Sequence, residues 1–459
     1  MLHRLTPRLI FVLVIFFAGL GAAATTSSQG VAGNPPCHAN AKKKDECSPG
    51  ETTSGATTAG PTTGTTATGT TATGTTTTPT TSTGTTPKLT TTTTTTSTTT
   101  TTTGGSSFAV AAPQAPSSYA LPAPHVYVRS SAELVSALQQ SNRDIVLADG
   151  LYDHSGPFFN AGGNRVYAEH NGGAVLTAGF VVGGNSGVAG SVLRGLRFSV
   201  SSPSKTLLNS VIHVWGLGGV NAQLLDLALD GSAAIGAGIM ARQTEGITVR
   251  RISANRFVDF GVIIEPNNTS LRPAVPAQVS DVAVSGVSRA TPRSSGGTAE
   301  ACLWIGIRSE VRRIRLRSCA WEGLWTGTAA HNSLFEDLDI ASSGVAGIYL
   351  EHWTTNSVFR RFKIDCPPGC YGINMEWNDP AWGGTAASVD NIFEDGTVAN
   401  GRVGAYMQPG TTRTTVRRVT FSGQTFSAIN DWDGVQNAYY ENVYRLSAGL
   451  SAITDQWVG

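Results

Sequence analysis

A short pattern of apolar and charged residues returns about every 24 positions through the C-terminal two thirds of the chain, and it restricts the fold more than any other feature. The apolar residues that open the successive copies are Val249, Val279, Val311, Phe335, Phe359, Phe393, Val416 and Tyr440. Their spacings of 30, 32, 24, 24, 34, 23 and 24 indicate a unit of about 24 residues, with loops inserted in the longer copies. Two outward residues and then alternating apolar positions follow each opening residue, which is typical of a half-buried strand.

A second short strand recurs in register with the first and is opened by glycine. Clear copies are Gly261-Val-Ile-Ile-Glu265, Gly323-Leu-Trp-Thr-Gly327, Gly347-Ile-Tyr-Leu-Glu351, Gly372-Ile-Asn-Met-Glu376 and Gly404-Ala-Tyr-Met-Gln408. Two strands per unit, with glycine and asparagine at the bends, form one turn of a β-solenoid. The sequence therefore predicts an all-β domain of about ten turns over residues 120–459.

The charged pairs after the opening residues alternate in sign from one copy to the next. They are Arg312-Arg313, Glu336-Asp337, Arg360-Arg361, Glu394-Asp395, Arg417-Arg418 and Glu441-Asn442. Equivalent residues of successive turns lie about 4.8 Å apart in a parallel solenoid, so opposite charges there attract. We therefore expect a structural ladder. Left-handed bends are expected three residues before the opening position, at Asn332, Asn356, Asp390 and Asn437.

The N-terminal third contains no part of this repeat. Residues 1–24 have a basic start, an apolar core and an alanine-rich exit, which are typical of a secretory signal peptide. That core is shorter than the roughly 20 residues that a membrane helix needs, so we expect a secreted protein without a membrane span. Residues 25–50 form a short cysteine-containing segment, and residues 51–119 form a Thr-rich linker that is predicted to be disordered.

Charge and cysteine content limit the partners and the compartment. A net charge of +1 with 14% charged residues provides no basic field for nucleic acid, and a monomer is expected. Six cysteines in an exported chain favour disulfides, with 15 possible pairings. The local candidates are Cys37 with Cys47 and Cys366 with Cys370. Zinc at the second pair is disfavoured because no further Cys or His pair accompanies it.

The start of the domain carries a family resemblance. The segment from His125 to Leu138 is amphipathic and helical in pattern, and a strand-like segment from Asp144 to Tyr152 follows it. This order resembles the opening of the pectate-lyase-like superfamily, particularly its chondroitinase B and alginate lyase branch. The resemblance covers about residues 126–459 and implies a right-handed parallel β-helix with an N-terminal capping helix. It implies no particular reaction, because the superfamily includes lyases, hydrolases, epimerases and adhesins.

The catalytic residues of the lyase branch do not carry over from the resemblance. Those enzymes use a lysine base with an arginine nearby, whereas this domain has only Lys205 and Lys363. Lys205 lies in a loop, and Lys363 falls in the charge-bearing strand, where an exposed ladder position is expected.

The third residues of the glycine-opened strands are predicted to point outward. They are Ile263, Trp304, Trp325, Tyr349, Asn374, Tyr406 and Ile429. Flat rings along an exposed strand face would hold sugar rings by their apolar faces. The alternative is that long loops, such as residues 291–300, fold over this face and bury the rings.

The fifth residues form a second outward column that contains carboxylates. They are Glu265, Gly306, Gly327, Glu351, Glu376, Gln408 and Asp431. Glu351 and Glu376 fall on adjacent turns, so they should share a proton, bind a hard cation or perform acid and base catalysis. One rung between them approaches the spacing of a retaining glycosidase, and the two rungs from Glu376 to Asp431 approach that of an inverting one.

These columns and the adjoining loops provide the candidate site. The candidate catalytic residues are Glu351, Glu376, His352 and Asp379, and the candidate substrate-binding residues are Trp304, Trp325, Tyr349, Tyr406, Trp377 and Arg242. Arg242 could instead pair with Glu265. Calcium is possible at the carboxylates, no metal site is assigned, and no other cofactor is expected. A structural carboxylate pair without catalysis is the alternative.

Two functions are consistent with these patterns. The first is a secreted polysaccharide lyase or glycoside hydrolase that binds a polymer along the aromatic face. The second is a noncatalytic carbohydrate-binding or adhesin-type surface or matrix protein. Only the carboxylates and His352 favour the first.

Overall fold

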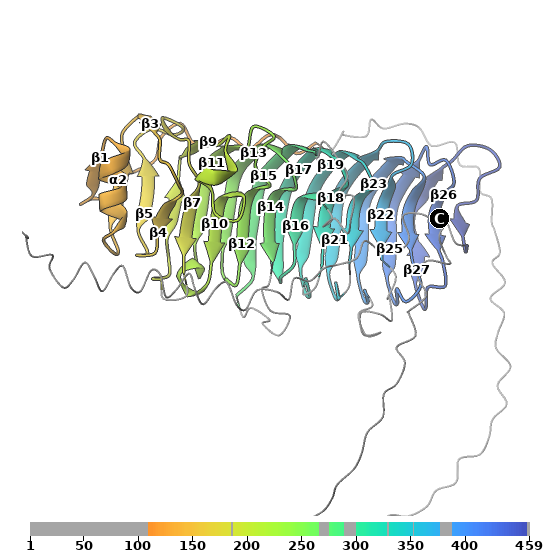
Figure 1. Ribbon diagram of the computed structural model, residues 1–459. Coiled ribbons are helices and arrows are strands. Elements are labelled where there is room, and N and C mark those ends of the chain that lie inside the picture. Colours follow the sequence, from red (N-terminus) through yellow and green to blue (C-terminus); the bar gives the residue numbers. More distant parts are fainter. Residues whose placement is uncertain are drawn as a thin grey trace, which may run out of the picture. The chain divides into compact units, whose positions relative to one another are not determined.

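The structure is a computed structural model that describes residues 109–184, 187–265, 275–288, 300–327, 330–351, 353–376 and 388–456. These residues form a coil of two sheets in which all named strand pairings are parallel, and successive turns lie side by side (Figure 1). The fold is a right-handed parallel β-helix, with the hand that parallel crossover connections take in nearly all proteins. The signal peptide, the Cys37–Cys47 segment and the Thr-rich residues before 109 lie outside the described residues.

Each turn of the coil adds one strand to a 12-stranded sheet. Its strands are β4 (Phe158–Asn160), β7 (Phe180–Gly183), β10 (Ser210–Trp215), β12 (Ala237–Arg242), β14 (Phe260–Glu265), β16 (Ala301–Ile305), β18 (Glu322–Thr326), β20 (Ala346–Leu350), β22 (Tyr371–Met375), β24 (Val403–Met407), β26 (Ser427–Asp431) and β29 (Ile453–Thr454).

A 17-stranded sheet closes the other side of the coil. Its strands are β1 (Val126–Val128), β2 (Asp144–Leu147), β3 (Gly150–Tyr152), β5 (Arg165–Ala168), β6 (Ala174–Leu176), β8 (Val192–Arg194), β9 (Arg197–Ser199), β11 (Gln223–Asp230), β13 (Thr248–Phe257), β15 (Ala277–Val287), β17 (Ser309–Cys319), β19 (Leu334–Ser343), β21 (Val358–Cys366), β23 (Ile392–Asn400), β25 (Thr415–Ser422), β27 (Ala438–Tyr440) and β28 (Val443–Arg445). The described chain also has one α-helix, α2 (Ser131–Leu138), and two 3-10 turns, η3 (Pro203–Lys205) and η4 (Leu217–Gly219).

The predicted opening residues lie one above another inside the coil. From Val249 to Val416 each pairs with its predicted neighbour, which confirms the register over seven copies. Phe335, Phe359 and Phe393 form an internal stack with ring centroids 4.6 and 4.7 Å apart. Buried apolar side chains from both sheets fill the space around this column. The hydrophobic core therefore runs continuously along the coil.

The last copy was predicted one residue out of register. Val416 pairs with Tyr439, not with Tyr440, and the left-handed residue before it is Gln436 instead of Asn437. Tyr439 packs against the hydrophobic core inside the coil. Tyr440 lies beside Arg417 with its ring exposed. Two consecutive tyrosines satisfy the repeat equally well by composition, and it is the first that packs against the core.

The charge ladder is present and is longer than predicted. The second residue of each pair adopts a left-handed conformation, and the signs alternate through Asp226, Arg251, Asp281, Arg313, Asp337, Arg361, Asp395, Arg418 and Glu441. Each arginine of this column forms a bidentate ion pair with the aspartate of the preceding turn. Arg361, for example, donates from its Nε and Nη2 atoms to the two carboxylate oxygens of Asp337 at 2.7 and 3.2 Å. The same pairing joins Arg313 to Asp281 and Arg418 to Asp395. In the adjoining column Arg312 also pairs with Glu336 at 2.7 Å, so ion pairs join the turn of Arg313 to the turn of Asp337 as well.

Reversing one sign in this ladder should destabilise the protein more than removing the charge. Asp337→Arg places a like charge beside Arg361 and Arg313, whereas Asp337→Asn only removes the attraction. We expect the free energy of unfolding of Asp337→Arg to be about 1 kcal/mol lower than that of Asp337→Asn at low salt. Denaturant unfolding at low and high salt measures the difference. Equal stabilities at low salt would show that solvent screens these charges.

A glycine is the second residue of six strands of the 12-stranded sheet, β12, β14, β18, β20, β22 and β24, and it permits close packing of the two sheets. A Cβ atom built on Gly347 would lie 2.7 Å from the carbonyl oxygen of Gly372 in the next turn and would also overlap Ile364. Real Cβ atoms do not approach a carbonyl oxygen so closely, so the position requires glycine. The repeated glycine in the sequence is therefore a packing signature.

The helix α2 lies at the N-terminal end of the coil (Figure 1). Ser130 caps it by accepting a hydrogen bond from the backbone of Glu133, and Leu134, Ala137 and Leu138 are buried in the core. No helix among the described residues is long and apolar enough to cross a membrane.

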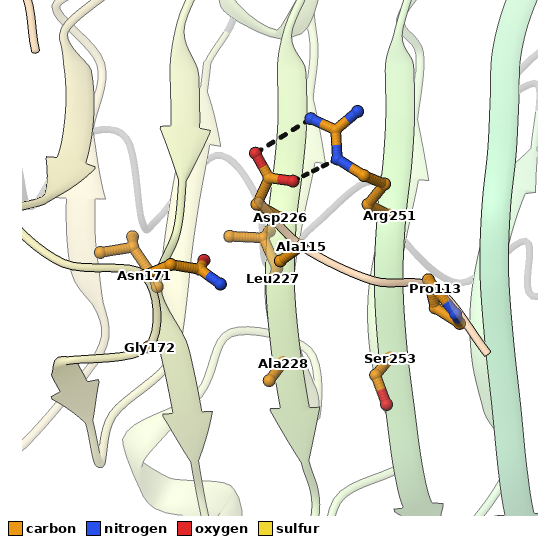
Figure 2. A pocket seen from close by; sticks show the side chains of 10 residues that line it. Pro113, Ala115, Asn171, Gly172, Asp226, Leu227, Ala228, Arg251 and Ser253 are labelled. Carbon is orange, nitrogen blue, oxygen red and sulfur yellow. Dashed lines mark hydrogen bonds and ion pairs between the residues drawn. The ribbon is translucent and has the colours of Figure 1, made fainter. Parts of the chain in front are cut away.

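Residues 109–119 lie along the outer face of the 17-stranded sheet. Tyr119 donates its hydroxyl to the carbonyl oxygen of Ala168 at 2.5 Å, and the guanidinium of Arg194 lies 4.2 Å from the centre of its ring. Figure 2 shows Pro113 and Ala115 above a small cavity, of about 140 Å³, beside the ion pair of Asp226 and Arg251. The sequence placed residues 109–119 in the linker, and the structure shows that they contact the coil.

Two disulfides join neighbouring parts of the coil. Cys366–Cys370 is the pair expected from spacing. Cys302–Cys319 links β16 to β17, a pairing that spacing alone could not select from the 15 possibilities.

Candidate active site

The candidate site lies on the outer face of the 12-stranded sheet. Strand pairing places Ile263, Trp304, Trp325, Tyr349, Asn374 and Tyr406 in one column, as predicted. The next member is Asn430, not Ile429, because β26 pairs one residue later than the pattern indicated. Ile429 is instead buried in the core.

The aromatic rings of this column are buried, which corrects the expectation of an exposed stripe. Trp325, Tyr349 and Tyr406 are only 7%, 9% and 4% exposed, whereas Trp304 is half-buried. Trp304 and Trp325 stack with ring centroids 4.6 Å apart. The rings pack against each other and against further apolar side chains. The alternation of the strand therefore predicted the direction in which the rings point, but it did not predict that they are buried.

Two aromatic residues of this face were missed because they precede the glycine. Phe260 packs 5.6 Å from Trp304, and Tyr371 stacks 5.4 Å from Tyr406, between ring centroids. Asn374 lies between Tyr349 and Tyr406 in the column, so the rings form two groups instead of one continuous platform. The position before the glycine faces outward because the glycine itself faces inward, which interrupts the simple alternation.

Glu351 and Glu376 continue the ladder beyond the ends of β20 and β22. The backbone N–H of Glu351 donates to Thr326 at 2.8 Å, and that of Glu376 donates to Leu350 at 2.9 Å. The two residues are therefore one rung apart, which corresponds to about 4.8 Å between equivalent backbone atoms. Both side chains are half-buried, so solvent still reaches part of each. The sequence prediction that they adjoin each other agrees with this register.

Aromatic side chains hold the two carboxylates in different environments. The indole Nε1 of Trp325 donates to Oε2 of Glu351 at 3.1 Å. The hydroxyl of Tyr349 forms a hydrogen bond with Glu376. A Cβ atom on Gly327 would lie 2.7 Å from Oε2 of Glu351, so the glycine provides the space into which that carboxylate turns. The rings thus position the acids in addition to covering the sheet.

Burial keeps a proton on this pair near neutral pH. Desolvation and the neighbouring charge of Glu376 raise the pKa of Glu351 from 4.5 to about 8, although the Trp325 hydrogen bond opposes the rise. A carboxyl group with such a pKa is a proton donor at neutral pH, and Glu376 is beside it to act as a base or nucleophile.

Sequence analysis missed two further carboxylates of the cluster. Glu300 and Glu322 are buried immediately before β16 and at the start of β18. Desolvation raises the pKa of Glu322 well above its usual value, and the charges of Glu351, Glu300 and Glu376 raise it further. Glu322 Oε2 is buried without a hydrogen-bond partner among the described residues. Like Phe260, Glu322 precedes a strand-opening glycine, where the simple alternation breaks.

The stability of the protein should fall as pH rises from about 4.5 toward 8. The folded state keeps the Glu351 proton over this range, whereas the unfolded state releases it. The stabilisation that results is fully present below the pKa of Glu351 in the unfolded state, and it is lost as pH rises through the pKa of Glu351 in the folded state. Denaturant unfolding at pH 5 and pH 8 should show a smaller decline for Glu351→Gln than for the parent. Equal declines would mean that Glu351 ionises normally in the folded protein.

The remaining candidate residues are placed as follows. Arg242 forms an ion pair with Glu265 in the next turn, which is one of the two roles expected for it. Asp431 does not belong to the Glu376 column, because it pairs with Met407 and its carboxylate accepts a hydrogen bond from Asn437. The inverting arrangement of Glu376 with Asp431 is therefore wrong. His352, Trp377 and Asp379 lie outside the described residues.

Three potential metal-ligand atoms do not come together at these carboxylates in the part of the chain that the structure describes. The one group there with three potential ligand atoms within 4.8 Å of one another is Asp149, Glu169 and His170, on the turns near α2. His170 already contacts Asp149 at 3.0 Å. Calcium at Glu351 and Glu376 stays a prediction.

Comparisons with known proteins assign this chain to no family. No family model matches the chain, and no curated protein matches it. The A-module of a mannuronan C-5 epimerase from Azotobacter vinelandii is 12% identical, with a TM-score of 0.45 over 72% of this chain and 93% of the module. The catalytic unit of an α-1,3-glucanase from Streptomyces thermodiastaticus is 11% identical, with a TM-score of 0.46 over 76% and 71%. An alginate lyase bound to a trisaccharide is 10% identical, with a TM-score of 0.39 over 72% and 88%.

Proposed function

We propose that this protein is a secreted carbohydrate-active enzyme that cleaves an extracellular polysaccharide at Glu351 and Glu376. The observation that carries the proposal is the adjacency of two half-buried carboxyl groups of which one retains its proton near neutral pH. Such a pair can give a proton to a departing oxygen while the partner supplies negative charge. Secretion is proposed from the signal peptide in the sequence.

The buried state of the rings favours an enzyme over a noncatalytic binder. An adhesive platform needs exposed aromatic faces, whereas Trp325, Tyr349 and Tyr406 are nearly inaccessible. Trp304 is half-buried and stacks on Trp325, whose indole binds Glu351, so Trp304 is the ring of this column best placed to contact a sugar beside the acids. The rings therefore support the carboxylates chiefly by excluding water from them.

The proposal is tested by incubating the full mature protein with a panel of neutral, amino-sugar and uronic-acid polysaccharides. New reducing ends and the ultraviolet absorbance of unsaturated products are followed separately. We expect cleavage of at least one polymer, with a bell-shaped pH dependence whose alkaline limb falls near the pKa of about 8 of Glu351. If the parent binds a polymer but cleaves none, the binder alternative replaces this proposal.

A further inference from the structure

We infer that the polymer cleaved at this site is built from sugars without an acid group, and that it is cleaved by hydrolysis and not by β-elimination. This inference rests on the proposed function and specifies its substrate class. The observation behind it is the set of side chains on the outer face of the 12-stranded sheet, among which the described residues provide several carboxyl groups and few basic ones.

The described outer face carries five glutamates along neighbouring turns. They are Glu265, Glu300, Glu322, Glu351 and Glu376. The charges that act most strongly on Glu322 and Glu351 are those of other carboxylates. Arg242 is the basic residue in this column, and it is already paired with Glu265. The described groups around the catalytic pair thus offer no free cation to an incoming anion.

Glu322 provides independent evidence that the cluster receives a ligand. Its side chain is 4% exposed, and Oε2 has no hydrogen-bond partner among the described residues. A buried polar atom without a partner costs free energy unless something binds it. A sugar hydroxyl is a suitable partner, because it can donate to an ionised carboxylate or accept from a protonated one.

The absence of a described cation opposes an elimination mechanism. β-Elimination removes the proton next to the uronate carboxylate, and the negative charge that develops on that carboxylate must be stabilised by positive groups. Each uronate would instead bring a further negative charge beside Glu376, whose carboxylate must be ionised to react, as the charge that it exerts on Glu351 requires. The outer face therefore repels anionic polymers and accepts neutral or cationic ones.

Hydrolysis uses the groups that are present. Glu351 donates its proton to the glycosidic oxygen as the bond from that oxygen to the anomeric carbon breaks, and the Glu376 carboxylate bonds to the anomeric carbon. Water then attacks that carbon and gives a proton to Glu351, and the bond to Glu376 breaks, so both residues return to their starting states. The single rung between them agrees with the roughly 5 to 5.5 Å of a retaining hydrolase.

The test uses the full mature protein with a neutral glucan, an amino-sugar polymer and a uronic-acid polymer, at low and high salt. We expect new reducing ends from the neutral or amino-sugar polymer, no unsaturated product, and at least tenfold slower turnover of the uronate polymer at low salt. Proton NMR should show a first-formed product that retains its anomeric configuration. The amino-sugar rate should fall as salt rises, because salt screens attraction to the carboxylates.

The two proposals fail in different ways. Efficient cleavage of the uronate polymer at low salt, or any unsaturated product, overturns the inference and leaves the enzyme proposal standing. Inversion at the anomeric carbon excludes the mechanism written for Glu376. If the parent cleaves no polymer, the proposed function and this inference both fail. Glu322→Gln adds a further readout, since loss of affinity for neutral oligosaccharides is expected, and unchanged affinity would remove Glu322 from the site.

Discussion

Replacing Glu351 by Gln should lower the rate of polysaccharide cleavage by about 10²–10⁴-fold. The amide cannot donate a proton to the departing oxygen, although it retains the shape that accepts the Trp325 hydrogen bond. Glu376→Gln should be at least as harmful, because an amide does not form the bond to the anomeric carbon that the Glu376 carboxylate forms. Initial rates on the polymer identified in the panel measure both effects, and affinity electrophoresis should show that both variants still bind it.

Glu310→Gln is a matched control for these two substitutions. Glu310 lies on β17, in the other sheet, where its carboxylate contacts Arg312 at 3.5 Å at an exposed position. We expect the control to cleave the polymer at the parent rate. If Glu351→Gln and Glu376→Gln also keep that rate while folding normally, the pair is structural and the reaction takes place elsewhere on the coil.

Phe359→Ala should reduce the free energy of unfolding by about 3–5 kcal/mol. The ring of Phe359 is fully buried between Phe335 and Phe393, so its removal leaves a cavity inside the internal stack and exposes a ring face on each side. Denaturant unfolding followed by circular dichroism provides the measurement. Phe159→Ala is the control, because Phe159 is 54% exposed and its loss should change the stability by less than about 0.5 kcal/mol. If the two substitutions lowered the free energy of unfolding by similar amounts, the internal stack would not be an important part of the hydrophobic core.

The register of the coil was predictable because two independent patterns define it. Apolar alternation specifies which residues face inward, and the charge signs specify which turns are neighbours. The prediction was wrong in the last turn, where Tyr439 and Tyr440 are equivalent by composition and only the packing of Tyr439 against the core distinguishes them. In the preceding strand, β26, the pairing is displaced by one residue in the opposite direction, which removed Ile429 and Asp431 from their predicted columns.

The candidate site was predictable in part, for a different reason. Periodicity indicates the direction in which Trp325 or Glu351 points, and the structure agrees on both. It carries no information on what lies over the sheet, so the burial of the rings could not be predicted. Glu322 was missed because the glycine that follows it interrupts the alternation, so that two consecutive residues after the outward one face inward.

The alternating signs of the charge ladder repeat every two turns of the coil. Arg313 pairs back to Asp281 and Arg361 pairs back to Asp337, so a complete module consists of two turns, one acidic and one basic. Deleting the turn that carries Asp337 would bring Arg361 against Arg313, whereas deleting two consecutive turns would restore an acid beside a base. This part of the protein can therefore grow or shrink by duplication or loss of turns only in even numbers, unless a charge reversal accompanies the change.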